Sequence, residues 1–231
     1  MNRSADLPLL PPDIWLARGA VLLVVVLQLL VVNDITLEPR WVAPALELAL
    51  LAPLSIATAW HQGRARSADD QLQFQRLVRR RGQIRGSALL LTGVLTLMNV
   101  ASLGGLVRAL VAGHAGDART LLLDALNIWG TNVIIFALWF WALDDASRTP
   151  RPEEADFIFT QEQPGNADTF KDWAPGFIDY LFLAYTNATA FSPSDTFPLT
   201  ARAKIMMMLE SGISFITIGV VAARAVGVIT S

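Results

Sequence analysis

Apolar residues in this chain fall in long blocks separated by polar segments. A helix needs about 20 mostly apolar residues to cross a bilayer, because each residue adds only about 1.5 Å. Five stretches meet that length and are predicted to span: Trp15–Val32, Trp41–Trp60, Ser87–Ala112, Thr120–Leu143 and Ala201 to about Val228. The pattern therefore predicts an all-α integral membrane protein of five transmembrane helices, with a polar tail over residues 1–14.

A sixth apolar stretch, residues 177–189, is too short to cross a membrane, because as a helix it would extend only about 20 Å. It is followed by a polar hairpin, FSPSDTFPLT, within residues 190–200. Irregular backbone at membrane depth is tolerated only where protein buries it or where it lines a water-filled cavity. The pattern therefore predicts a re-entrant helix followed by a hairpin.

Two connecting segments differ sharply in charge. Residues 61–86, predicted to be a loop within the three-helix region 15–119, carry seven arginines. This excess favours a cytoplasmic location, and the same arginines could also bind anionic lipid or a partner. Residues 144–176 are rich in acidic residues and proline, which is typical of a solvated linker, with a short turn expected at FIFT.

Composition supports the membrane class and excludes several others. Only 16% of residues are charged, against about 25% in an average soluble domain. The chain has no cysteine and only two histidines, His61 and His114, which lie in different connecting segments. We therefore expect no disulfide, no metal site, no cofactor and no enzymatic activity. The net charge of −2 and the absence of a polybasic tail indicate no nucleic-acid partner.

Ionisable and amide side chains interrupt the predicted spans. Polar groups in hydrocarbon are costly, so they are expected to face the bundle interior, water or one another. The candidates are Glu47, Asn99, Asp124 and Asn132. Among them Glu47 is of most interest, because its helix also carries Pro44 and Pro53. Glu47 is therefore a candidate for a functional role, and the alternative is that it only forms a hydrogen bond between helices.

The order of elements from residue 120 onwards resembles the pore module of the two-transmembrane potassium-channel family. The filter region of that family has the pattern T-T-V-G-Y-G-D-x-x-P-x-T. Aligned without gaps, this chain matches its first threonine, aspartate, proline and last threonine with Thr189, Asp195, Pro198 and Thr200. The chain also resembles an uncharacterised group of bacterial membrane proteins with a similar hairpin, and the bacterial inner membrane is the expected location.

The resemblance covers residues 120–231 and implies an outer helix over 120–143, a linker, a pore helix over 177–189, the hairpin and an inner helix over 201–228. It also implies that Gly212 and Gly219 are possible hinges of the inner helix. The candidate pore and filter residues are Thr189, Ala190, Phe191, Ser192, Pro193, Ser194, Asp195 and Thr196.

The candidate filter departs from the family where potassium selectivity arises. Ser192 and Ser194 replace two glycines, which reach the required backbone conformations cheaply. Pro193 fixes its own φ angle and biases Ser192 towards extended conformations. Hydroxyl groups and the Asp195 carboxylate remain. They are expected to form a wider, hydrated ring that favours monovalent cations.

A single hairpin cannot close a pore, so the channel hypothesis requires a symmetric homotetramer in membrane lipid. The alternative is a non-conducting membrane assembly or regulatory protein that uses the hairpin for packing. A secondary transporter is less well supported, because the sequence shows no internal repeat.

The orientation of the hairpin remains open. The family has its filter mouth outside, whereas a cytoplasmic Arg-rich segment followed by two spans returns the chain to the cytoplasm at Asp144. Arg202 and Lys204 also favour an inward mouth. Either the module is inverted, or one of the two spans does not cross, or the arginines are external.

Overall fold

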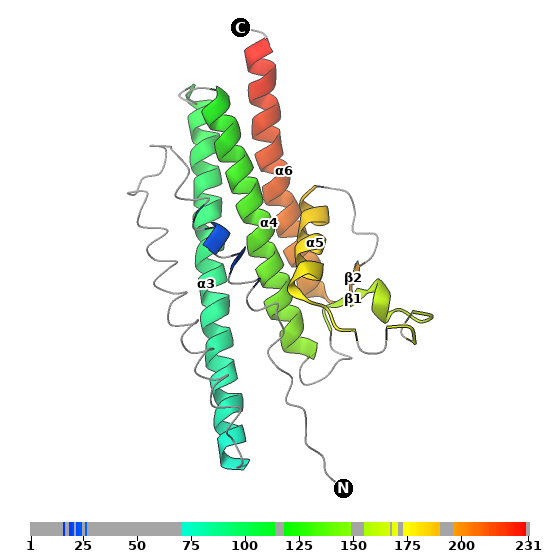
Figure 1. Ribbon diagram of the computed structural model, residues 1–231. Helices are drawn as coiled ribbons and strands as arrows, with labels where there is room; N and C mark the ends of the chain where they lie inside the picture. The colour runs from blue at the N-terminus through cyan, green and yellow to red at the C-terminus, as the bar shows by residue number, and fades with distance from the viewer. Residues whose placement is uncertain are drawn as a thin grey trace.

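The computed structural model describes residues 16, 19–20, 22–24, 26, 71–113, 118–148, 155–166, 168–170, 173–189 and 196–229. From residue 71 onwards the elements are α3 (Gln71–Val111), α4 (Ala118–Arg148), β1 (Phe157–Phe159), the 3₁₀ helix η2 (Thr160–Glu162), α5 (Phe177–Ala188), β2 (Thr196–Pro198) and α6 (Ala201–Ile229). Figure 1 shows α3, α4 and α6 as long neighbouring helices, with the short α5 beside the first half of α6.

Within the described residues, three helices are long and apolar enough to cross a membrane. Their apolar stretches are Leu89–Val111, Arg119–Asp144 and Ala201–Arg224. They agree with the third, fourth and fifth predicted spans and indicate a membrane protein. The second predicted span lies outside the described residues, and so does most of the first.

Helix α4 is the central element of the described bundle. Every residue from Thr131 to Leu138 is buried, as expected for a helix that is apolar on all sides. Its neighbour α3 runs antiparallel to it, and the two are joined after Gly113, whose φ of 72° suits glycine at a helix end. The indole nitrogen of Trp139 donates to the Thr96 hydroxyl at 2.9 Å, which adds a polar contact between α3 and α4.

The Arg-rich segment was predicted to be a loop over residues 61–86, and this prediction is wrong from Gln71 onwards. Helix α3 is continuous from Gln71 to Val111. Glutamine, leucine and arginine are good helix formers, and this segment contains no proline. The start of α3 lies towards the same end of the bundle as the end of α4 and extends beyond it (Figure 1).

The described part of the acidic linker contains more regular structure and is more buried than predicted. Helix α4 continues to Arg148, and the expected turn at FIFT is strand β1, which pairs antiparallel with β2. The register places Phe157 opposite Pro198 and Phe159 opposite Thr196. Both phenylalanines are buried, and their rings contact Tyr180 of α5 edge-on. Alternating aromatic residues at a period of two explain the strand.

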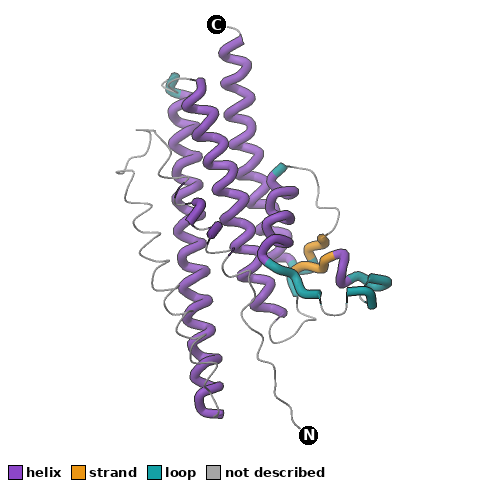
Figure 2. The backbone as a smooth tube through the Cα atoms, in the orientation of Figure 1, coloured by secondary structure: helices purple, strands orange, loops and turns teal. Residues whose placement is uncertain are grey.

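Helix α5 spans Phe177–Ala188, within one residue of the predicted 177–189. The Asp179 carboxylate accepts a hydrogen bond from the Gly176 backbone N–H at 2.7 Å, which caps its first turn. Residues at three- and four-residue spacing, including Tyr180, Leu183 and Ala184, are buried. Figure 2 shows the two strands near the end of the bundle where α5 and α6 begin. The short helix is therefore enclosed on one side and secured at its start.

Candidate functional site: polar contacts around the short helix

A buried carboxylate joins the elements at the start of α5. Asp144 of α4 is fully buried. It accepts hydrogen bonds from the backbone N–H groups of Asp156 and Phe157, at 2.6 and 3.3 Å, and from the Tyr180 hydroxyl at 2.5 Å. One side chain thus fixes the end of α4, the linker strand and the first turns of α5 together.

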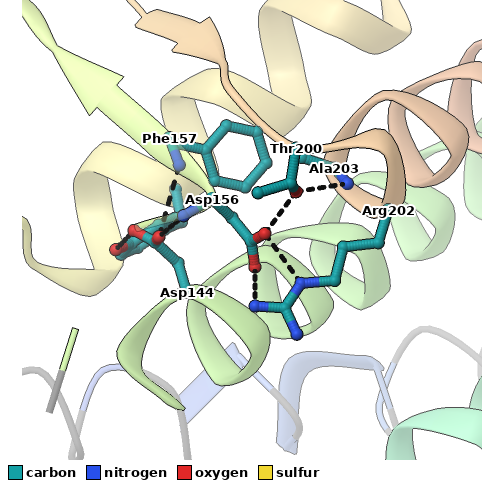
Figure 3. Close-up of polar contacts among 7 residues, drawn as sticks. Asp144, Asp156, Phe157, Thr200, Arg202 and Ala203 are labelled. Carbon is teal, nitrogen blue, oxygen red and sulfur yellow. Dashed lines mark hydrogen bonds and ion pairs between the residues drawn. The ribbon is translucent and has the colours of Figure 1, made fainter. Parts of the chain in front are cut away.

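A second buried carboxylate, Asp156, joins the linker to the start of α6 (Figure 3). It accepts a hydrogen bond from the Thr200 hydroxyl. Its two oxygens also contact the Arg202 guanidinium, through Nε at 2.7 Å and a terminal nitrogen at 2.7 Å. The Thr200 oxygen accepts in turn from the Ala203 N–H at 3.2 Å and so caps α6. We call Asp144, Asp156, Tyr180, Thr200 and Arg202 the mouth network.

Arg202 was interpreted from the sequence only as an indicator of orientation, and the structure gives it a structural partner. Replacing Arg202 with methionine is expected to destabilise the fold by about 1–2 kcal/mol, because Asp156 is buried while Arg202 is about half exposed. Thermal unfolding in a mild detergent measures this loss. Lys204→Met is the matched control, since Lys204 is exposed on the same helix. Equal effects of the two substitutions would contradict the role given to Arg202.

A second polar cluster lies deeper along α6 and joins three helices. Glu210 of α6 is fully buried, and its Oε2 accepts a hydrogen bond from Nδ2 of Asn187 in α5 at 2.7 Å. From α4, Nδ2 of Asn132 donates to the Glu210 carbonyl at 3.2 Å and to the Ser214 hydroxyl at 2.9 Å. We call Asn132, Asn187, Glu210 and Ser214 the three-helix cluster.

The three-helix cluster contains an unsatisfied acceptor. Glu210 Oε1 has no hydrogen-bond partner among the described residues. A buried carboxylate with one unsatisfied oxygen is costly in a membrane, and such residues usually serve a function. Asn132 was predicted from the sequence to face the bundle interior, water or another polar residue, and the structure places it in the interior, 1% exposed.

The structure says less about the role of the other predicted intramembrane residues. Asn99 and Asp124 are buried, and Asn99 Nδ2 and Asp124 Oδ2 have no hydrogen-bond partner in the described part of the chain. Glu47 lies outside the described residues. Gly212 and Gly219, the possible hinges, are exposed within the continuous helix α6. In residues 71–113, 118–148, 155–189 and 196–229, as far as they are described, no group of acidic or histidine side chains could hold a metal ion.

Of the candidate filter, only its two ends are described. Thr189 is the C-cap residue of α5, and its hydroxyl donates to the Tyr185 carbonyl at 2.8 Å. Thr196 is buried in β2. Residues 190–195, from Ala190 to Asp195, lie outside the described residues. The chain therefore enters the hairpin from the end of α5, beside α6, and leaves it through strand β2 of the small sheet.

Sequence reasoning missed most of both networks. Glu210 carried a usable signal, an acidic residue ten positions into an apolar span, but it was not among the intramembrane candidates named from the sequence. Asn187 was hidden inside a short apolar segment. Asp144 and Asp156 could not be separated from the other acids of the linker, because their burial depends on the pairing of β1 with β2.

Comparison with known proteins finds no match among models of protein families, curated proteins or solved structures.

Proposed function

We propose that this chain forms a cation channel or channel-like pore of the potassium-channel type, with a non-standard and weakly selective filter. The observation that carries the proposal is the placement of α5. It begins where α4 ends, at the Asp144–Tyr180 hydrogen bond, and it ends beside Glu210, well along α6. A half-length helix between two long apolar helices is the arrangement expected of a re-entrant pore helix.

The direction of α5 supports cations as the permeant species. Its N-terminus lies at the mouth network and its C-terminus lies beside the three-helix cluster. The C-terminal end of a helix carries a partial negative charge, which attracts cations. The Asp195 carboxylate, predicted to lie in the hairpin, adds to this preference.

The outer face of α6 supports a symmetric assembly. A stripe of apolar and small residues repeats at alternating four- and three-residue spacing, as at the contact face of packed helices. All of its members are exposed in the single chain: Ala201, Ile205, Met208, Gly212, Phe215, Gly219 and Ala222. The opposite face packs within the chain. We propose that the outer stripe contacts neighbouring copies in a homotetramer.

We further propose that the hairpin mouth faces the cytoplasm of a bacterial inner membrane. The start of α3, which carries five of the seven arginines, lies towards the same end of the bundle as the end of α4 and the start of α6 (Figure 1). Positive charge favours the cytoplasmic side. This orientation is opposite to that of the family the module resembles.

The alternative is a non-conducting assembly or regulatory protein. One specific observation favours it: Ser192 and Ser194 stand where a potassium filter has glycines, and Pro193 lies between them. Serine and proline make a ladder of ion-facing carbonyls difficult to form. In that case the hairpin would serve packing, and the chain would show no ion flux.

Asp195→Asn is the experiment that tests the proposed pore. Asp195 is the only acidic residue between Asp179 and Glu210, and a symmetric ring of four carboxylates attracts cations. We expect the substitution to lower the cation-to-anion permeability ratio, measured from reversal potentials in lipid bilayers under a salt gradient. Asp168→Asn, in the linker, should leave the ratio unchanged. An unaltered ratio in Asp195→Asn would remove this residue from the selectivity argument.

A further inference from the structure

We propose that Glu210 is a positioning residue, which holds the C-terminal end of α5 against α6 and so sets where the hairpin begins. The attachment of α5 is independent of conduction. Its consequence for ion flow rests on the function proposed above.

The hydrogen bonds between the end of α5 and α6 converge on Asn187. Asn187 Nδ2 donates to Glu210 Oε2 at 2.7 Å and to the Met207 carbonyl at 2.9 Å. The Ser211 hydroxyl donates to the Asn187 carbonyl at 3.3 Å. Asn187 precedes Thr189, the C-cap of α5, by two residues. One turn of α6 therefore holds the last turn of α5 at the point where the hairpin starts.

The α6 side of this attachment is itself tied to the bundle. Asn132 of α4 donates to the Glu210 carbonyl and to Ser214, within the same stretch of α6. Helix α4 is the most buried of the three long apolar helices that the structure describes. Glu210 thus connects the end of α5 to a part of α6 that α4 holds in place.

Stability alone does not explain a glutamate at this position. Its Oε1 is buried and has no hydrogen-bond partner among the described residues, and an incompletely bonded buried carboxylate contributes little to folding. Replacing such a group with an apolar residue of similar volume is often neutral or stabilising. What methionine could not supply is the acceptor for Asn187.

The start of α5 has its own attachments, so loss of Glu210 should affect only its far end. Tyr180 bonds to Asp144, and Asp179 caps the first turn through Gly176. At the other end, the ring of Tyr185 contacts Trp129 at 5.9 Å between ring centroids. We therefore expect Glu210→Met to loosen the last turn of α5 while its first turn and the other helices stay as they are.

Hydrogen–deuterium exchange of the full chain in lipid nanodiscs tests this directly. In Glu210→Met, the amides of residues 185–189 should exchange about tenfold faster, which corresponds to the loss of one buried hydrogen bond. Peptides from α4 and from the start of α5 should keep their rates, and the Tm should stay within a few degrees. Glu210→Gln keeps an acceptor oxygen and should restore slow exchange.

Two further variants keep the test decisive. Asn187→Ala removes the same bond from the α5 side, and combining it with Glu210→Met should add little, because both act on one interaction. Thr217→Val is the matched control, since Thr217 is buried on α6 but its hydroxyl donates to the Ile213 carbonyl of its own helix at 2.8 Å. It should leave α5 unchanged.

The outcomes separate this proposal from the proposed function. Unchanged exchange at residues 185–189 in both Glu210→Met and Asn187→Ala would overturn it, and so would Glu210→Gln exchanging as fast as Glu210→Met. If Glu210→Met fails to fold, Asn187→Ala decides alone. If the exchange pattern holds but the wild-type protein passes no ions, the positioning role stands and the pore proposal fails.

Discussion

Asp144→Ala is expected to cause the largest loss of stability of any single substitution considered, about 2–5 kcal/mol. The substitution leaves the Tyr180 hydroxyl and the Asp156 backbone N–H without their acceptor, and both lie in a buried region. Each orphaned buried donor costs about 1–3 kcal/mol. Thermal or denaturant unfolding in detergent, followed by tryptophan fluorescence, measures the loss.

Two variants that remove fewer or less buried hydrogen bonds should cause smaller losses of stability. Tyr180→Phe removes a single donor and should cost less than Asp144→Ala, because the carboxylate keeps both backbone contacts. Glu162→Ala removes an acceptor from a partly buried backbone N–H at Phe159 and should cost least. If Asp144→Ala were no more destabilising than Glu162→Ala, the mouth network would not hold the linker to the bundle.

Gly212→Leu is expected to disrupt the proposed tetramer without harming the single chain. A side chain at Gly212 meets nothing within 4 Å in the protomer, and leucine favours a helix more than glycine does. Where neighbouring copies pack against the outer stripe of α6, the added side chain overpacks each contact by about 1–3 kcal/mol. Native mass spectrometry in mild detergents should show tetramers for the wild type and smaller species for the variant.

Gly104→Leu provides the matched control. Gly104 is also exposed on an apolar helix, α3, and a side chain there meets nothing within 4 Å. It lies outside the outer stripe of α6, so the tetramer should survive. A wild-type monomer across several detergents, or a Gly212→Leu variant as tetrameric as Gly104→Leu, would contradict the assembly proposed here.

Periodicity and length predicted the helices well, because these depend on local sequence. The apolar blocks after Ser87 and Thr120 and the block beginning at Ala201 are long helices, and the short helix was predicted within one residue of its end. The error at Gln71 had a local cause as well. A high density of arginine was interpreted as a loop, although arginine is compatible with helix.

The polar networks could not be predicted in the same way, because they depend on contacts between distant segments. Asp156 meets Thr200 and Arg202 only once β1 has paired with β2. Asn187 contacts Glu210 only when α5 packs beside α6. An isolated acid in an apolar span does signal a buried polar site, so Glu210 was detectable as a candidate, although its partner was not.

Ion flux through the purified protein in liposomes, with bi-ionic potassium and sodium gradients, tests the central claim most directly. The proposal predicts a cation flux whose reversal potential shows a potassium-to-sodium preference within a few-fold, because Ser192, Pro193 and Ser194 disfavour a dehydrating filter. A preference of about a hundredfold or more would show that the hairpin strips hydration from the ion and would contradict the weakly selective filter. No flux from correctly assembled protein would contradict the pore itself.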